Sequence, residues 1–113
     1  MNKFIPVNQP LIEATDIKAV TQSLKSGWIS SEGPAVKKFE NNFSKFIGHK
    51  FGVAVSNGTA ALEIAVKSLN LKKSDEIIIP NFTIISNALP ALKLGIKMRF
   101  VDCNVNDWNF DLN

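Results

Sequence analysis

The chain has 113 residues, of which 45% are hydrophobic, so its composition is that of a globular protein and not of a disordered one. Thirteen basic residues against ten acidic ones give a formal charge of +3, and the scattered lysines argue against a nucleic-acid-binding surface. No apolar run approaches the roughly 20 residues of a membrane helix. A single cysteine cannot form an internal disulfide, so we expect a soluble, cytoplasmic protein.

The first half of the chain predicts two amphipathic helices. One covers residues 13–26 and is stopped by Gly27, and the other begins at Pro34 and is ended by Gly48. Their apolar residues recur at helical spacing, as Ile17, Val20 and Leu24 in the first, and Val36, Phe39, Phe43, Phe46 and Ile47 in the second. We expect the aromatic stripe of the second helix to pack in a core.

The second half of the chain alternates between strand-like and helix-like patterns. Short apolar runs predict three buried strands, at residues 51–55, 76–79 and 98–101. Helical spacing returns in residues 58–69 and again in residues 83–94, where Thr83 is an expected cap and Pro90 is expected to bend the helix. This order predicts an α/β fold with a mainly parallel sheet and right-handed crossovers. Three strands alone leave that sheet poorly covered, so we expect an incomplete domain.

The segment from Ser56 to Ala61 lies where a predicted strand passes into a helix, at the edge of a parallel sheet where ligands bind. Free N–H groups and the helix dipole at such a point favour a phosphate group. Gly58 permits close approach to the backbone, and Thr59 adds a hydroxyl donor. The alternative is that Ser56 or Asn57 only caps the helix while Gly58 serves the turn. The segment has neither the dinucleotide-binding spacing nor that of a P-loop.

A series of motifs runs along nearly the whole chain: Ile5–Pro10, Ser26–Ile29, Gly33–Pro34, Phe39–Glu40, Phe46–Gly48, Ser56–Leu62, Asp75–Pro80, Phe82–Thr83 and Phe100–Asp102. In order and spacing this series resembles the start of the DegT/DnrJ/StrS-type sugar aminotransferases, especially perosamine-synthase-like members. The resemblance implies that residues 1–113 are the N-terminal portion of the large domain of the aspartate-aminotransferase-like fold, fold type I of the pyridoxal-phosphate (PLP) enzymes. That domain is α/β, with a mainly parallel sheet and flanking helices.

By this resemblance, four residues at the helix start bind the cofactor, pyridoxal 5′-phosphate: Asn57, Gly58, Thr59 and Ala60. Ile84 occupies the position of an aromatic residue that stacks on the cofactor ring in the family. An aliphatic side chain there still covers the ring but loses stacking worth about 0.5–1.5 kcal/mol.

Gly27 and Trp28 match a family loop near an active site that is built at a dimer interface, so they are the expected substrate-binding residues. Packing at the helix end or between subunits is the alternative role for Trp28. Family members hold the aldehyde with a lysine and the pyridine nitrogen with an aspartate, both downstream of this region. We therefore name no catalytic residue and no metal ligand in this chain.

The implied activity is amino transfer, with glutamate as donor, to a nucleotide-linked keto-sugar used in surface polysaccharide synthesis. The implied protein is a cytoplasmic homodimer with neither nucleic acid nor membrane as partner. One alternative is a sugar dehydratase of the same family, in which histidine commonly replaces the downstream lysine. Another is an inactive truncated fragment that keeps a phosphate-binding segment. We expect the 113-residue chain alone to be inactive.

Overall fold

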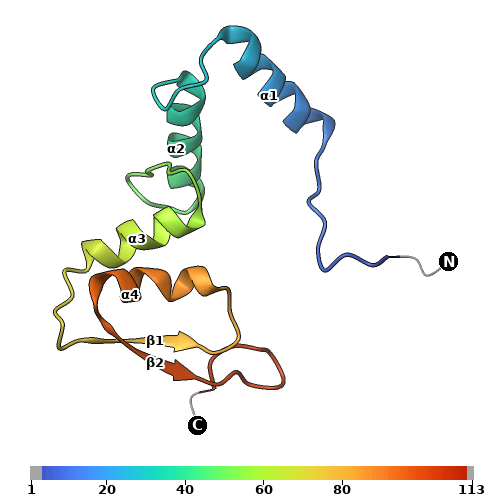
Figure 1. Ribbon diagram of the computed structural model, residues 1–113. Coiled ribbons are helices and arrows are strands. Elements are labelled where there is room, and N and C mark those ends of the chain that lie inside the picture. The colour runs from blue at the N-terminus through green and yellow to red at the C-terminus, as the bar shows by residue number, and fades with distance from the viewer. Residues whose placement is uncertain (1–3, 112–113) are drawn as a thin grey trace. The chain divides into compact units, whose positions relative to one another are not determined.

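The computed structural model describes residues 4–111. The chain forms two compact units. The first unit is Met1–Ala54 and the second is Val55–Asn113 (Figure 1). Within the part of the chain that the structure describes, no helix is both long and apolar enough to cross a membrane.

In the described part of the first unit, residues 4–54, the regular structure consists of two helices, α1, Ala14–Ser26, and α2, Pro34–Phe46. At the start of α1, the backbone N–H of Glu13 donates to the carboxylate of Asp16 at 2.9 Å, and this bond closes a capping box. The helix ends at Gly27, whose φ of 75° lies in the left-handed region that favours glycine. Pro34 occupies the first turn of α2, where its missing N–H is not needed. The two predicted helices are confirmed.

Residues 51–55 do not form the predicted strand, and within residues 4–111 they pair with no other strand. The backbone at Gly52 and Ala54 packs against α2 instead. The Ala54 N–H donates to Glu40 Oε1 at 2.8 Å, and a Cβ added to Gly52 would lie 2.8 Å from the Glu40 carbonyl oxygen. A strand needs a partner for its backbone groups, and an apolar run in the sequence does not show whether one is available.

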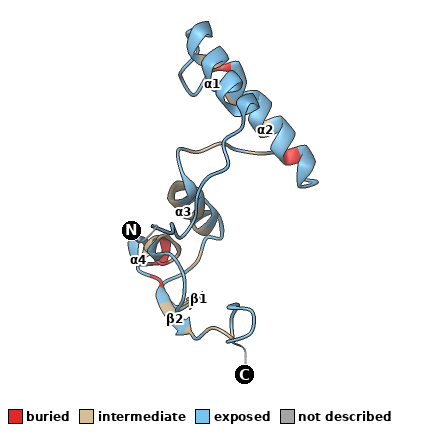
Figure 2. Cartoon of the chain, turned by 90° about the vertical axis from the view of Figure 1, so that its right-hand side faces the viewer, coloured by how far each residue is buried: buried red, intermediate tan, exposed pale blue. Residues whose placement is uncertain are grey.

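The apolar stripe of α2 is largely exposed, so the prediction that it packs in a core is wrong for this structure. The rings of Phe39 and Phe43 stack on each other with centroids 5.7 Å apart, and Phe46 is 87% exposed. Figure 2 shows that exposed surface dominates both α1 and α2. The physical reason is that α1 is the only other helix among residues 4–54, and it carries exposed apolar residues of its own, including Val20 and Leu24.

The second unit contains α3, Gly58–Ser68, β1, Glu76–Pro80, a 3-10 helix η1, Ile85–Asn87, α4, Leu89–Leu94, and β2, Lys97–Val101. The two strands are parallel, with Glu76 opposite Lys97 and Pro80 opposite Val101. Figure 1 shows α4 between α3 and the strands. The parallel pairing and the flanking helices confirm the predicted α/β class.

The predicted helix over residues 83–94 is replaced by η1 and the short helix α4. A continuous helix would need an N–H on Pro90 to reach the carbonyl of Ser86, and proline has none. Pro90 therefore lies in the first turn of α4 and does not bend it. Thr83 does not cap a helix either, because its Oγ1 accepts a hydrogen bond from Asn87 Nδ2 at 2.6 Å.

The core of the second unit lies where α4 meets the sheet. Its most buried residues are Ile79, Ala88, Pro90, Ala91 and Ile96. An ion pair between Lys93 and Glu63 adds a surface link between α4 and α3. The packing of α4 on both α3 and the strands fixes the position of η1, which immediately precedes α4 in the chain.

Candidate functional site

The start of α3 is capped by a side chain. Asn57 is extended, with φ −168° and ψ 171°, and its Oδ1 accepts the Ala60 N–H at 2.9 Å. The Ala61 N–H then donates to the Asn57 carbonyl at 3.1 Å, which begins the helical ladder. The capping role considered for Asn57 is therefore confirmed, and the backbone donor of Ala60 is already engaged by this cap.

Two backbone donors remain at this helix end. Across residues 4–111, the N–H groups of Gly58 and Thr59 donate no hydrogen bond. They are the first two residues of α3, where N–H groups have no partner within the helix and where the helix dipole is positive. This end of α3 can accordingly offer two convergent donors to an anion.

The surroundings of Gly58 differ sharply from those of Gly52. A Cβ added to Gly58 would meet no heavy atom within 4 Å, and the φ angle of this residue is not in the left-handed region. No contact or backbone angle in the described structure requires glycine here. A glycine in a helix interior costs about 0.5–1 kcal/mol relative to alanine, and the cost is smaller in the first turn, where Gly58 lies. Its presence is consistent with a ligand that approaches the backbone closely.

The Thr59 side chain connects α3 to η1. Its Oγ1 donates to Ser86 Oγ at 3.0 Å, and both residues are half-buried. Because η1 follows the carboxyl end of β1, this bond places the start of α3 at that edge of the sheet. Open α/β sheets bind their ligands at this edge.

Sequence reasoning did not identify Ser86. The only available signal was a polar residue following Ile84 and Ile85 in a segment expected to be one helix. The break that Pro90 causes in that helix creates η1, and Ser86 reaches Thr59 from η1.

Ile84, the expected cover for a cofactor ring, immediately precedes η1 and is 68% exposed. It lies two residues before Ser86, the residue that bonds to Thr59. Phe82 has a different partner, because its ring packs against Trp108 with centroids 5.0 Å apart. The aromatic ring of Phe82 is thus engaged elsewhere, and Ile84 remains the predicted ring contact.

Gly27 and Trp28 belong to the first unit, whereas the residues around α3 and η1 belong to the second. Gly27 ends α1, and the Trp28 N–H donates to Ser26 Oγ at 3.2 Å. The loop folds tightly, since a Cβ on Gly33 would lie 3.3 Å from the Trp28 carbonyl oxygen. The Trp28 side chain is 55% exposed, so its ring is available for contact, and its role in substrate binding stays a prediction.

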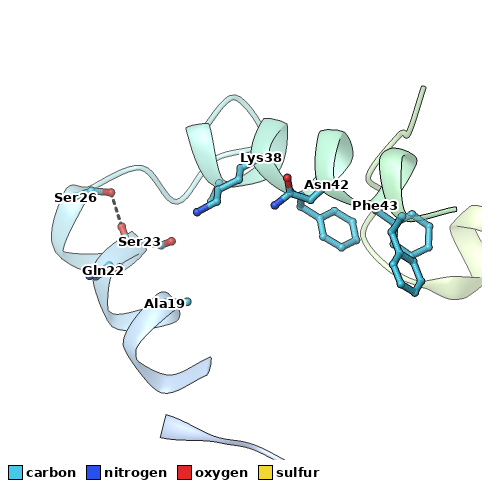
Figure 3. A pocket seen from close by; sticks show the side chains of 10 residues that line it. Ala19, Gln22, Ser23, Ser26, Lys38, Asn42 and Phe43 are labelled. Atoms are coloured by element: carbon cyan, nitrogen blue, oxygen red, sulfur yellow. Dashed lines mark hydrogen bonds between the residues drawn. The ribbon is translucent and has the colours of Figure 1, made fainter. Parts of the chain in front are cut away.

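A cavity of about 660 Å³ lies between α1 and α2 in the first unit (Figure 3). Its lining consists of Ala19, Gln22, Ser23, Ser26, Ala35, Lys38, Asn42 and the three phenylalanines of α2, Phe39, Phe43 and Phe46. Lys38 is the one ionisable side chain in that lining, and Figure 3 shows it reaching from α2 toward the side of α1 that carries Ser23. Such a lining provides packing surface, but it lacks an acid–base pair.

The charged side chains of the sheet, Glu76, Lys97 and Arg99, lie toward the amino ends of β1 and β2, away from η1. Arg99 Nε donates to Glu76 Oε2 at 2.8 Å, and Lys97 Nζ lies 3.9 Å from Glu76 Oε1. The hydrogen bond from Arg99 is the largest cause that lowers the pKa of the Glu76 carboxyl, and the same bond raises the pKa of Arg99. Since Glu76 and Lys97 are the first residues of their strands, this cluster supports strand register. No set of residues within 4–111 is arranged to hold a metal ion.

The amino-acid sequence is similar to those of known proteins over nearly the whole chain. The spore coat polysaccharide biosynthesis protein SpsC of Bacillus subtilis is 40% identical over 110 residues, which cover 97% of this chain and 28% of SpsC. GDP-perosamine synthase of Escherichia coli O157:H7 is 35% identical over 111 residues, which cover 98% of this chain and 30% of that enzyme. The chain thus spans less than a third of the length of these relatives.

Solved structures agree with the sequence matches. E. coli GDP-4-keto-6-deoxy-D-mannose-3-dehydratase with bound hydrated PLP superposes with a TM-score of 0.83 at 31% identity, over 94% of this chain and 28% of the dehydratase. The DegT/DnrJ/EryC1/StrS aminotransferase family matches residues 10–113. The match covers both units, including the capped start of α3 and its bond to η1. The chain therefore belongs to the DegT/DnrJ/EryC1/StrS aminotransferase family.

Proposed function

We propose that the start of α3 binds the phosphate of pyridoxal 5′-phosphate in a sugar-modifying enzyme. The observation that carries this proposal is the pair of unpartnered N–H groups on Gly58 and Thr59 beside open space, in a chain of this family. Family membership and the local geometry support the proposal independently, because the unpartnered donors follow from the contacts of this chain alone.

The donors present suit a phosphate group. Two backbone N–H groups and the hydroxyl of Thr59, whose side chain is held by a bond to Ser86, meet at the positive end of a helix of 11 residues. These groups are neutral, and each provides a directed hydrogen bond to a dianion. Asn57 contributes by holding the helix start in place, and Ile84 would cover a face of the cofactor ring.

We propose that the complete protein transfers an amino group from glutamate to a nucleotide-linked keto-sugar, in amino-sugar synthesis for surface polysaccharide. The cofactor supplies temporary storage of the amino group between the two half-reactions. Support comes from the 35% identity to GDP-perosamine synthase and the 40% identity to a spore coat polysaccharide biosynthesis protein. The residues of this chain would bind and orient the cofactor, and Gly27 and Trp28 would contact the sugar nucleotide.

A dehydratase is the second candidate, because a PLP-bound sugar-nucleotide 3-dehydratase superposes on this chain with a TM-score of 0.83. Both candidates use the same phosphate site, so the features of residues 4–111 serve either reaction. They predict different products. Both release 2-oxoglutarate when glutamate loads the cofactor, but an aminotransferase then yields an amino sugar, whereas a dehydratase yields a deoxy keto-sugar and ammonia.

The test uses the natural protein that carries this chain, loaded with PLP and mixed with glutamate. An aminotransferase or a dehydratase of this type should convert the cofactor absorbance to that of the pyridoxamine form. GDP-4-keto-6-deoxy-D-mannose is then added, and the products are separated by mass spectrometry. An amino sugar supports the first candidate, and a 3-deoxy keto-sugar supports the second. No spectral change with glutamate, in protein that has bound PLP, would refute the amino-transfer proposal.

We further propose that residues 1–113 are the N-terminal portion of a large cofactor-binding domain and that the protein is a cytoplasmic homodimer. The family resemblance supports both statements, and the lone cysteine suits a reducing compartment. Light scattering on the natural protein would show a mass of two subunits. A monomer that still binds cofactor and turns over substrate would contradict the dimer proposal.

A further inference from the structure

The contact between Thr59 and Ser86 provides more than a link between two helices. It joins hydroxyl groups that are 3.0 Å apart, one from the first turn of α3 and one from η1. Neither side chain is fully buried, so each hydroxyl group could instead form a hydrogen bond with water. The bond also lies directly beside the unpartnered N–H of Thr59.

A threonine hydroxyl inside a helix can bond back to a carbonyl of the preceding turn, but Thr59 is the second residue of α3 and has no preceding helical turn. In this structure the Thr59 hydroxyl bonds to Ser86 instead. The Ser86 contact keeps Thr59 Oγ1 at the helix start, on the side of η1.

The hydroxyl groups of Thr59 and Ser86 also have one hydrogen that is not used in the bond between them. Two hydroxyl groups carry two hydrogens, and only one is used in the bond from Thr59 to Ser86. No acceptor among residues 4–111 takes the hydrogen of Ser86. When the Thr59 hydroxyl turns to donate to an anion, rotation of the Ser86 hydroxyl lets Ser86 donate to Thr59 Oγ1. The Thr59 oxygen then stays satisfied in both arrangements.

We propose that Ser86 is a positioning residue of the phosphate site, and that it holds the Thr59 hydroxyl in the orientation that receives the phosphate. This inference rests on the proposed function. Ser86 acts through Thr59, so its effect should appear in affinity for phosphorylated ligands and should vanish when Thr59 lacks its hydroxyl.

The experiment measures dissociation constants for PLP and for pyridoxal, which lacks the phosphate, by absorbance titration of the natural protein. Loss of one hydrogen bond to a charged group typically weakens binding about 10-fold. We expect Ser86→Ala to weaken PLP binding about 5- to 10-fold and to leave pyridoxal binding unchanged. The double variant Thr59→Ala/Ser86→Ala should bind PLP no more weakly than Thr59→Ala alone.

Two further comparisons separate positioning from folding. Ser86→Thr keeps a hydroxyl and Ser86→Val has the same shape without one, so the first should bind PLP more tightly than the second. Ser68→Ala is the matched control, because Ser68 Oγ donates to the Ala65 carbonyl within α3 and should not affect either ligand.

Three results would overturn the inference: unchanged PLP affinity in Ser86→Ala, equal losses for PLP and pyridoxal, or fully additive losses in the double variant. A different result bears on the proposed function. If wild-type protein bound pyridoxal as tightly as PLP, the phosphate site itself would be refuted, and the role of Ser86 with it.

Discussion

Replacing Gly58 by alanine should separate the stability of the protein from its affinity for the cofactor. In the structure without ligand, the added Cβ projects into open space with no heavy atom within 4 Å, and no left-handed backbone angle resists it. Alanine is the better helix former, by about 0.5–1 kcal/mol in a helix interior and by less in the first turn. We therefore expect the free energy of unfolding to stay the same or to rise slightly.

The same methyl group would occupy the space in which a phosphate contacts the Gly58 N–H. A phosphate pushed away from two backbone donors loses charge-assisted bonds worth about 1.5–3 kcal/mol each, which corresponds to at least a 10-fold loss of PLP affinity. Urea unfolding of the ligand-free variant and absorbance titration with PLP measure the two effects. Unchanged PLP affinity, or a loss of stability above about 1 kcal/mol, would refute this reasoning.

Three further predictions concern the two units separately. Asn57→Ala removes the cap on the Ala60 N–H and should destabilise the second unit by about 1 kcal/mol, as measured by urea unfolding. Gly52→Ala places a Cβ 2.8 Å from the Glu40 carbonyl oxygen and should cost about 1–3 kcal/mol, in contrast with the neutral Gly58→Ala. The pKa of Glu76 is lowered in the fold by Arg99, so its contribution to stability is present above the unfolded-state pKa and is lost as pH falls through the folded-state value. The melting temperature of wild type should therefore fall more between pH 7 and about pH 3 than that of Glu76→Gln.

Each of these predictions has an outcome that contradicts it. An Asn57→Ala variant as stable as wild type would show that water satisfies the Ala60 N–H equally well. A Gly52→Ala variant with wild-type stability would show that the chain near Glu40 moves away at little cost. Identical acid-induced changes in wild type and Glu76→Gln would remove Glu76 from the account of acid stability.

Local signals were sufficient to predict several elements of this fold. Gly27 ends α1 because it accepts a left-handed backbone angle, and Pro34 begins α2 because its missing N–H is not needed in the first turn. Both effects are local, so α1 and α2 could be predicted without tertiary information. The β-branched run after Glu76 and the pattern through Val101 likewise predicted the two strands that form. Asn57 was recognised as a candidate cap from its place before a helical pattern.

Tertiary pairing explains what could not be predicted. Residues 51–55 have the apolar character of a strand, but the Ala54 N–H is bonded to Glu40 of α2, a contact between residues 14 positions apart. Ser86 became part of the site because Pro90 interrupts a helical pattern and the resulting 3-10 turn packs beside α3. Sequence periodicity contains no information on either contact.

The most direct measurement is a crystal structure of the natural protein with PLP bound. We expect phosphate oxygens within about 2.7–3.2 Å of the Gly58 and Thr59 backbone nitrogens, with the Thr59 hydroxyl also in contact and Ser86 still bonded to Thr59. A phosphate bound elsewhere, with the start of α3 facing only solvent, would contradict the central claim that this helix end is the phosphate site.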